Sequence, residues 1–136
     1  MPVAADRKRH CILVVEDDPD IREMEIAVLE DVGYTVAAAM NGADALDYLR
    51  ESVRPCLIML DLMMPVMDGF EFCRERRKDA DLAKIPVVIV SAIARDDPRI
   101  VDSGVVAHIR KPLDIELLIG TVARLCPGVM NHEQPA

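Results

Sequence analysis

Residues 56–69 read CLIMLDLMMPVMDG, and this stretch decides which fold the sequence favours. A short apolar run ends at Asp61, and the chain then breaks into a loop that contains Pro65 and Gly69. In open parallel sheets, ligands bind in the crevice at the carboxyl ends of the strands. A carboxylate at such a strand end can act as a metal ligand or as a nucleophile, although an Asp in this position can also cap a helix. The other strand ends have to distinguish these interpretations.

Four further apolar runs alternate with segments that have helical spacing. The runs occupy residues 11–15, 34–39, 86–90 and 105–109. Helices are predicted over residues 19–33, after the turn signal Asn41-Gly42, and over residues 69–80, 98–103 and 113–125. Strands that alternate with helices form βαβ units with right-handed crossovers. The expected fold class is therefore α/β: a three-layer sandwich with a five-stranded parallel sheet and five helices on its two faces.

The length of the chain allows one domain with a full core, since it has 136 residues. We expect a polar lead-in over residues 1–9, the domain over residues 10–126 and a short tail over residues 127–136. Hydrophobic residues make up 51 % of the chain and charged residues 29 %, which is typical of a globular protein rather than a disordered one.

The charge of the chain opposes direct binding to nucleic acid. Its net charge is −8, whereas binding to a phosphate backbone needs a basic face. Aromatic residues make up 3 %, too few for a platform of stacked bases. No apolar run approaches the roughly 20 residues of a membrane span, and no signal peptide opens the chain. We therefore expect a cytoplasmic protein with neither nucleic acid nor membrane as its direct partner.

The cysteines give no sign of a metal site. They stand at positions 11, 56, 73 and 126, and metal-thiolate sites favour short C-x-x-C spacings. Cys11 and Cys56 lie in apolar runs that resemble strands, so we predict that both are buried free thiols.

Polar residues follow four of the predicted strands: Glu16 and Asp17, then Asp61, Ser91 and Lys111. In a parallel sheet all five side chains meet at one edge. Three carboxylates placed together repel one another, so the cluster predicts a cation, and hard oxygen ligands suit Mg²⁺. With that metal, Asp61 is a candidate nucleophile toward phosphorus, and Ser91 and Lys111 are candidates to bind the phosphoryl oxygens. The bland alternatives are a strand-end cap for Ser91 and a solvated ammonium for Lys111, although the following Pro, with a cis bond, would aim Lys111 inward.

Residues 10–126 resemble the receiver domain of two-component response regulators. The motifs that carry the resemblance are Val14–Asp18, the loop Asp61–Gly69 with its Met64-Pro65 and Asp68-Gly69 pairs, Ser91-Ala92, and Lys111-Pro112. The resemblance implies a flavodoxin-like fold with strand order 2-1-3-4-5. It also implies that a histidine kinase phosphorylates Asp61, that Glu16 and Asp17 bind the metal together with the Met63 backbone carbonyl, and that Ser91 and Lys111 couple the phosphoryl group to the surface around the last two strands.

Some positions depart from the pattern of that family. The residue three before Lys111 is usually aromatic, and here it is His108, which either simply fills the space or swings inward on activation as a switch residue together with Ser91. The segment around Pro98 is short, which puts the signalling face in question. Met63 and Ile93 follow the nucleophile and the hydroxyl by two residues. Both are apolar and cannot orient an attacking water, so we predict slow self-dephosphorylation.

Three functions compete for this sequence. The leading one is a stand-alone receiver that switches a downstream protein or relays its phosphoryl group to a phosphotransfer protein, and an excised receiver of a longer regulator would look the same. The second is an aspartyl-phosphate phosphatase, but haloacid-dehalogenase-like enzymes carry a second Asp where this chain has Met63. The third is a scaffold without phosphorylation, which the full set of site residues disfavours. A homodimer stays open.

Overall fold

The computed structural model describes residues 11–51, 54–92 and 105–126, and it places five parallel strands in one sheet. In spatial order the strands are β2 (Thr35–Ala39), β1 (Cys11–Val15), β3 (Leu57–Leu60), β4 (Val87–Ser91) and β5 (Ala107–Arg110). Each neighbouring pair is parallel. The predicted α/β class and the strand order 2-1-3-4-5 are confirmed.

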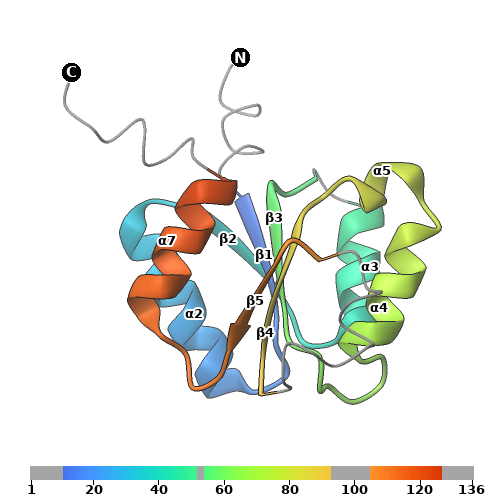
Figure 1. Cartoon of the computed structure of the whole chain (residues 1–136). Coiled ribbons are helices and arrows are strands. Elements are labelled where there is room, and N and C mark those ends of the chain that lie inside the picture. Colours follow the sequence, from blue (N-terminus) through green and yellow to red (C-terminus); the bar gives the residue numbers. More distant parts are fainter. Residues whose placement is uncertain (1–10, 52–53, 93–104, 127–136) are drawn as a thin grey trace, which may run out of the picture.

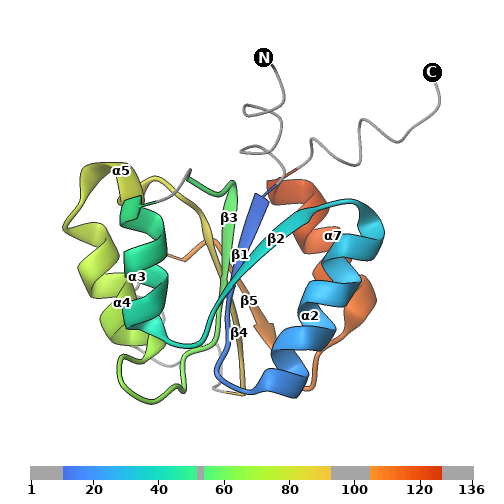
Figure 2. The same cartoon turned by 180° about the vertical axis from the view of Figure 1, so that it is seen from behind.

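Helices cover both faces of the sheet (Figure 1). They are α2 (Pro19–Val32), α3 (Gly42–Glu51), α4 (Gly69–Arg77), α5 (Ala80–Ala83) and α7 (Ile115–Leu125). Figure 1, and Figure 2 from behind, show α2 and α7 on one face and α3, α4 and α5 on the other. The three-layer sandwich therefore follows the right-handed crossovers that the sequence predicted. Within the three described ranges, no helix has the length and apolarity that a membrane crossing requires.

Helix α2 begins and ends as its sequence predicts. The Asp18 carboxylate accepts hydrogen bonds from the backbone N–H groups of Asp20 and Ile21, and Pro19 stands at the first helical position, where its missing N–H costs nothing. Gly33 ends the helix with φ 112°, a left-handed conformation that glycine adopts without a steric penalty. The chain therefore turns directly from α2 into β2.

Some boundaries differ from the predicted ones. The helix predicted over residues 69–80 ends at Arg77, because Asp79 caps a separate short helix, α5, by accepting hydrogen bonds from the backbone of Asp81 and Leu82. Strand β5 begins at Ala107 rather than at residue 105, and α7 begins after its capping residue Asp114 rather than at residue 113. The lead-in, the tail, Ile93 and the helix predicted over residues 98–103 lie outside the described residues.

Two apolar layers make up the core, one on each face of the sheet. Alternate residues of a strand enter opposite layers, as the pleat requires. Leu13 and Ile58 belong to the layer beneath α3, α4 and α5, whereas Ile12 and Leu57 belong to the layer beneath α2 and α7. Strands that are buried on both faces explain why the sequence shows continuous apolar runs rather than alternation.

The prediction of two free thiols in strand-like runs is half wrong. Cys11 is buried and free as predicted. Cys56 instead forms a disulfide with Cys126, 70 residues away, and the two Cα atoms lie 6.2 Å apart. Nothing in the sequence near either cysteine indicates this pair, because only the tertiary fold brings the start of β3 and the end of α7 together.

Candidate metal and phosphoryl site

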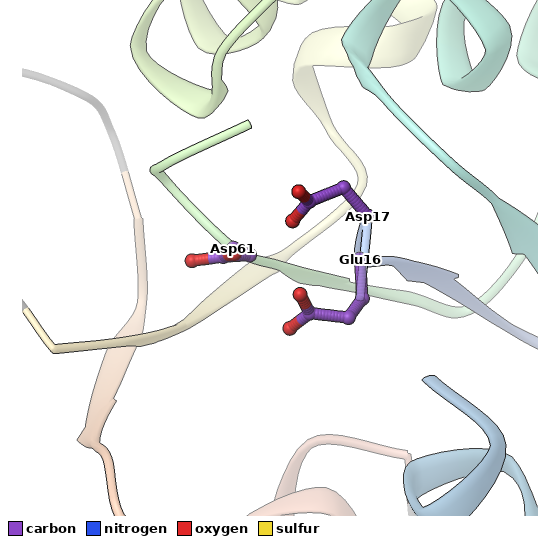
Figure 3. A group of neighbouring side chains, drawn as sticks. All are labelled: Glu16, Asp17 and Asp61. Atoms are coloured by element: carbon purple, nitrogen blue, oxygen red, sulfur yellow. The ribbon is translucent and has the colours of Figure 1, made fainter. Parts of the chain in front are cut away.

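The three acidic residues meet at the carboxyl edge of the sheet. The last residues of β1 and β3, Val15 and Leu60, pair with each other, so the residues that follow them leave the sheet side by side. One oxygen from each of Glu16, Asp17 and Asp61 lies within 4.8 Å of the other two. Figure 3 shows the three side chains grouped together. Like charges at this separation repel by several kcal/mol per pair at an effective dielectric of about 20. Nearby positive charge is therefore needed to keep all three carboxyl groups ionised.

Lys111, which follows the edge strand β5, supplies part of that positive charge. Its Nζ donates a hydrogen bond to Glu16 Oε1 at 3.0 Å and lies 3.7 Å from Asp61 Oδ2. Burial alone would disfavour the ammonium, but the hydrogen bond to Glu16 and the nearby carboxylates outweigh it and raise the pKa of Lys111. The Lys111-Pro112 peptide bond is cis, and the Lys111 N–H donates to the carbonyl of Ser91.

Lys111 alone does not offset the burial of the Glu16 carboxyl group. Burial raises the pKa of Glu16 to about 7, the hydrogen bond from Lys111 opposes that rise, and the charge of Asp61 adds to it. A divalent cation held by oxygen ligands would favour the ionised form of this carboxyl group. The charge and the carboxylate oxygens of Glu16, Asp17 and Asp61 therefore fit a divalent cation such as Mg²⁺.

Backbone contacts fix the loops that carry the acids. Arg22, one turn into α2, donates hydrogen bonds from Nη1 to the carbonyl oxygens of Glu16 at 2.9 Å and of Asp17 at 3.3 Å. The N–H of Met63 donates to Asp61 Oδ1 at 3.3 Å. Gly69 donates to the Leu62 carbonyl, and a Cβ at position 69 would lie 2.6 Å from the Asp61 carbonyl oxygen. The Asp61 loop therefore has no room for a side chain at position 69.

Of the other predicted site residues, Ser91 and Met63 lie at the same edge, whereas His108 lies within the sheet. Ser91 is fully buried at the end of β4, in register with Arg110 of β5. His108 is half-buried in β5, opposite Ile89 of β4. The Met63 side chain is exposed, although its N–H contacts Asp61.

Sequence reasoning missed two residues near the site. The first is Arg22, whose role depends on contacts that a spacing does not reveal. The second is Glu25, which is 2 % exposed on the inner face of α2. Burial, with the charge of Glu16 second, raises the pKa of Glu25 to about 8. Its spacing of four residues from both Ile21 and Leu29 places an acid on the apolar stripe, and that signal was available in the sequence.

An open groove of about 500 Å³ adjoins Lys111. Its other lining residues are apolar: Ile21 and Met24 of α2, Ala92 after β4, and Pro112 and Leu113 before α7. The site therefore continues into an apolar surface between α2 and the segment that follows β5.

Comparison with known proteins agrees with this architecture. The family model of the response regulator receiver domain matches residues 12–123. The chain belongs to this receiver domain family of two-component signalling systems.

Three similar proteins illustrate the range of the family. The chain is 38 % identical over 116 residues to the DNA-binding dual master transcriptional regulator RpaA of Synechocystis sp., covering 84 % of this chain and 48 % of RpaA. It is 38 % identical over 117 residues to an uncharacterised 14.6 kDa protein from the sodA1 3′ region of Leptolyngbya boryana, covering 85 % of this chain and 88 % of that protein. The receiver domain of the sensor histidine kinase PA1611 from Pseudomonas aeruginosa PAO1, with magnesium coordinated in its active site cleft, has a TM-score of 0.79 and 27 % identity, covering 87 % of this chain and 98 % of that chain. The chain spans about half the length of the first curated relatives that it matches.

Proposed function

We propose that Asp61 accepts a phosphoryl group from the phosphohistidine of a histidine kinase or a phosphotransfer protein. The observation that carries this proposal is the cluster of three carboxyl groups with the Lys111 ammonium 3.7 Å from Asp61 Oδ2. An Asp61 oxygen forms the new bond to phosphorus, the P–N bond of the donor breaks, and the departing imidazole takes up a proton from water. The product is an acyl phosphate on Asp61.

The proposed metal is Mg²⁺, held by Glu16, Asp17, Asp61 and the backbone carbonyl of Met63. When bound, Mg²⁺ supplies charge that neutralises the phosphoryl oxygens. The magnesium in the active site cleft of the PA1611 receiver domain supports this assignment. Arg22 holds the Glu16 and Asp17 backbone, so the two ligands are positioned before a cation arrives.

The protein itself binds and orients the phosphoryl group. Lys111 pairs with a phosphoryl oxygen through its ammonium, which already faces Asp61. Ser91 provides a hydroxyl at the end of β4 as a further donor. The hydrogen bond from the Lys111 N–H to the Ser91 carbonyl holds the backbones of these two residues next to each other. Positioning and charge neutralisation are the main catalytic contributions in phosphoryl transfer.

The protein assists only its own phosphorylation, through Asp61, Ser91 and Lys111, and does not turn over a separate substrate. We infer that the chain is a phosphoacceptor and not a phosphatase, since the position two residues after Asp61 carries Met63, whose exposed thioether cannot serve as a general acid or base.

The test uses a small-molecule phosphodonor such as acetyl phosphate with Mg²⁺. We expect the phosphorylated protein to approach one phosphoryl group per chain, and Asp61→Asn to abolish labelling. Asp18→Asn is the matched control, because Asp18 lies in the same acidic run, caps α2 and is replaced by an equally good capping residue. Sustained phosphate release would instead support the phosphatase, and a lack of labelling in the folded protein would support the scaffold.

The phosphodonor is proposed to be a protein that contacts the groove beside Lys111. That groove is apolar and adjoins the site, so a helical partner that presents a histidine can cover it while its imidazole reaches Asp61. We propose a cytoplasmic location, an unidentified downstream protein as output, and no direct contact with nucleic acid. A homodimer is an alternative arrangement for the output.

We propose a single domain over residues 10–126, acting as a stand-alone regulator. The Leptolyngbya boryana protein, 88 % of which aligns with this chain, supports this arrangement. The alternative is a receiver joined to an output domain, as the 48 % coverage of RpaA would suggest. An immunoblot of the native protein distinguishes the two by mass.

His108 is proposed to follow the phosphorylation state together with Ser91, as a switch. It lies in β5, three residues before Lys111, so a movement of Lys111 toward a phosphoryl group reaches it along the strand. NMR of the His108 ring tests this: we expect its chemical shifts to change when beryllium fluoride and Mg²⁺ bind, and unchanged shifts would remove His108 from the switch.

A further inference from the structure

The disulfide between Cys56 and Cys126 joins two elements at the edge of the sheet opposite the acidic cluster. Cys56 directly precedes β3, and Cys126 directly follows α7. The other end of β3 leads into Asp61, and the segment before α7 contains Lys111. The disulfide therefore fastens the far ends of the two segments that supply the carboxylate and the ammonium of the site.

Hydrogen bonds hold both cysteines independently of the disulfide. The Cys56 N–H donates to the carbonyl of Cys11 at 2.8 Å. The Cys126 N–H donates to the Val122 carbonyl at 2.7 Å, and the Tyr34 hydroxyl donates to the Cys126 carbonyl at 2.8 Å in the buried core. Cleavage of the disulfide removes none of these donors and acceptors, so the reduced protein keeps contacts at both cysteines while the end of α7 loses its covalent link.

The surroundings of Cys56 and Cys126 can also accommodate the two free thiols of the reduced state. Cys56 Sγ lies 3.2 Å from the Cys11 carbonyl oxygen, so a Cys56 thiol that rotates away from Cys126 would have a hydrogen-bond acceptor nearby. Cys126 is 3 % exposed among apolar residues, where a neutral thiol is well accommodated. Both oxidation states therefore fit the same backbone.

We propose that Cys56 and Cys126 are a reversible redox modification site, at which a cellular thiol opens the disulfide and loosens the end of α7. The proposal uses the cytoplasmic location proposed above, where a lasting structural disulfide is rare and most disulfides are transient or sense redox state. It does not require phosphorylation of Asp61, so either proposal can fail without the other.

The reaction is two successive thiol–disulfide exchanges. A thiolate of the reductant attacks Cys56 Sγ, the less buried of the two sulfurs, and forms a mixed disulfide while Cys126 leaves as a thiolate. A second thiolate of the reductant attacks the mixed disulfide and releases Cys56. Two electrons and two protons pass to the protein, and the reductant is oxidised to its own disulfide.

The experiment equilibrates the whole protein with mixtures of reduced and oxidised glutathione and then alkylates it under denaturing conditions. Of the four cysteines, we expect two to be alkylated in the oxidising mixtures and all four in the reducing ones, with Cys56 and Cys126 as the pair that changes in peptide mapping. Hydrogen exchange of the last turn of α7 is expected to become at least tenfold faster on reduction. The melting temperature is expected to fall on the order of 10 °C.

Matched variants separate the pair from the other thiols. Cys56→Ser and Cys126→Ala should show the faster hydrogen exchange and the lower melting temperature in every mixture. Cys73→Ala removes a free buried thiol and should keep the dependence of both quantities on the glutathione mixture. Four alkylated thiols in every mixture would overturn the proposal. A disulfide that resists a large excess of reduced glutathione in the native protein would overturn it as well, since it would then be a permanent structural link. Wild-type protein alone decides both outcomes.

Discussion

Lys111 Nζ donates a hydrogen bond to Glu16 Oε1 at 3.0 Å, although their strands are not neighbours. Glu16 follows β1 and Lys111 follows β5, with β3 and β4 between them in the sheet. The Lys111 side chain therefore reaches across two strand ends, and on the way it lies 3.7 Å from Asp61 Oδ2. This one ammonium links the end of β5 to both acids, so its removal should lower the stability of the carboxyl edge of the sheet.

Lys111→Met should lower the free energy of unfolding by about 2 kcal/mol at pH 8, because it removes the hydrogen-bond donor of buried Glu16 and the ion-pair partner of Asp61. The loss should be smaller at pH 5, where Glu16 is neutral, since its pKa is about 7. Denaturant unfolding without added metal measures both values. Lys78→Met is the control, because Lys78 pairs with Glu75 at the same kind of distance, 2.8 Å, but on the exposed surface of α4. Equal losses in the two variants would contradict the importance of burial here.

Glu25→Gln should make the protein more stable at high pH. The pKa of Glu25 is raised by burial from 4.5 to about 8, so the folded protein holds a proton that the unfolded chain releases. The contribution of this neutral carboxyl is complete below about pH 4.5 and is lost as the pH rises through about 8. We expect Glu25→Gln to gain on the order of 2 kcal/mol relative to wild type between pH 5 and pH 8.

Glu23→Gln is the control for that experiment, because Glu23 is exposed on the same helix. Glu16 also titrates in this range and remains in both variants, so only the difference between each variant and wild type reports on the replaced residue. A Glu25→Gln difference that stays flat between pH 5 and pH 8 would show that Glu25 is ionised in the fold.

Gly69→Ala should destabilise the protein and distort the Asp61 loop. The added Cβ would lie 2.6 Å from the Asp61 carbonyl oxygen and 2.8 Å from the Leu62 Cα, and backbone atoms cannot move aside as a flexible side chain can. We expect a loss of about 2 kcal/mol together with weaker Mg²⁺ binding in a metal titration. Gly120→Ala is the opposite case, because its Cβ would meet nothing within 4 Å on the exposed face of α7. That change should stabilise the protein by roughly 0.5–1 kcal/mol.

Met63→Glu and Met63→Asn should shorten the lifetime of the phosphorylated protein several-fold. The Met63 side chain is 62 % exposed two residues after Asp61, and a polar group there can orient the water that attacks phosphorus. Loss of labelled phosphate over time measures the rate. Val66→Asn, in the same loop and 83 % exposed, should leave the rate unchanged, and Asn tolerates the left-handed backbone at this position. A hydrolysis rate that Met63→Glu and Met63→Asn do not alter would refute the predicted slow self-dephosphorylation.

The sequence predicted the sheet well because four of its strands, β1, β3, β4 and β5, are largely apolar runs that end in a polar residue or are followed by one. The positions of Glu16, Asp17, Asp61 and Lys111 followed from that rule alone, since parallel strands end at one edge. Helix ends were predicted where a capping residue and Pro or Gly stand together, as at Asp18-Pro19 and Gly33. The break between α4 and α5 was missed, because the charged residues there are compatible with a continuous helix.

Contacts between distant parts of the chain could not be predicted in the same way. The Cys56–Cys126 disulfide depends on where α7 packs against the sheet, and a separation of 70 residues carries no pairing information. The spacing of Glu25 from Ile21 and Leu29 places it on an apolar stripe, but the depth of its burial, 2 % exposed, comes only from the fold.

The sheet divides the interior into two compartments that do not share side chains, with Leu13 and Ile58 on one side and Ile12 and Leu57 on the other. A cavity made in one compartment therefore has no direct route through side chains into the other. Substitutions in the layer beneath α3, α4 and α5 should therefore leave the packing beneath α2 and α7 largely unchanged, and the reverse should hold as well.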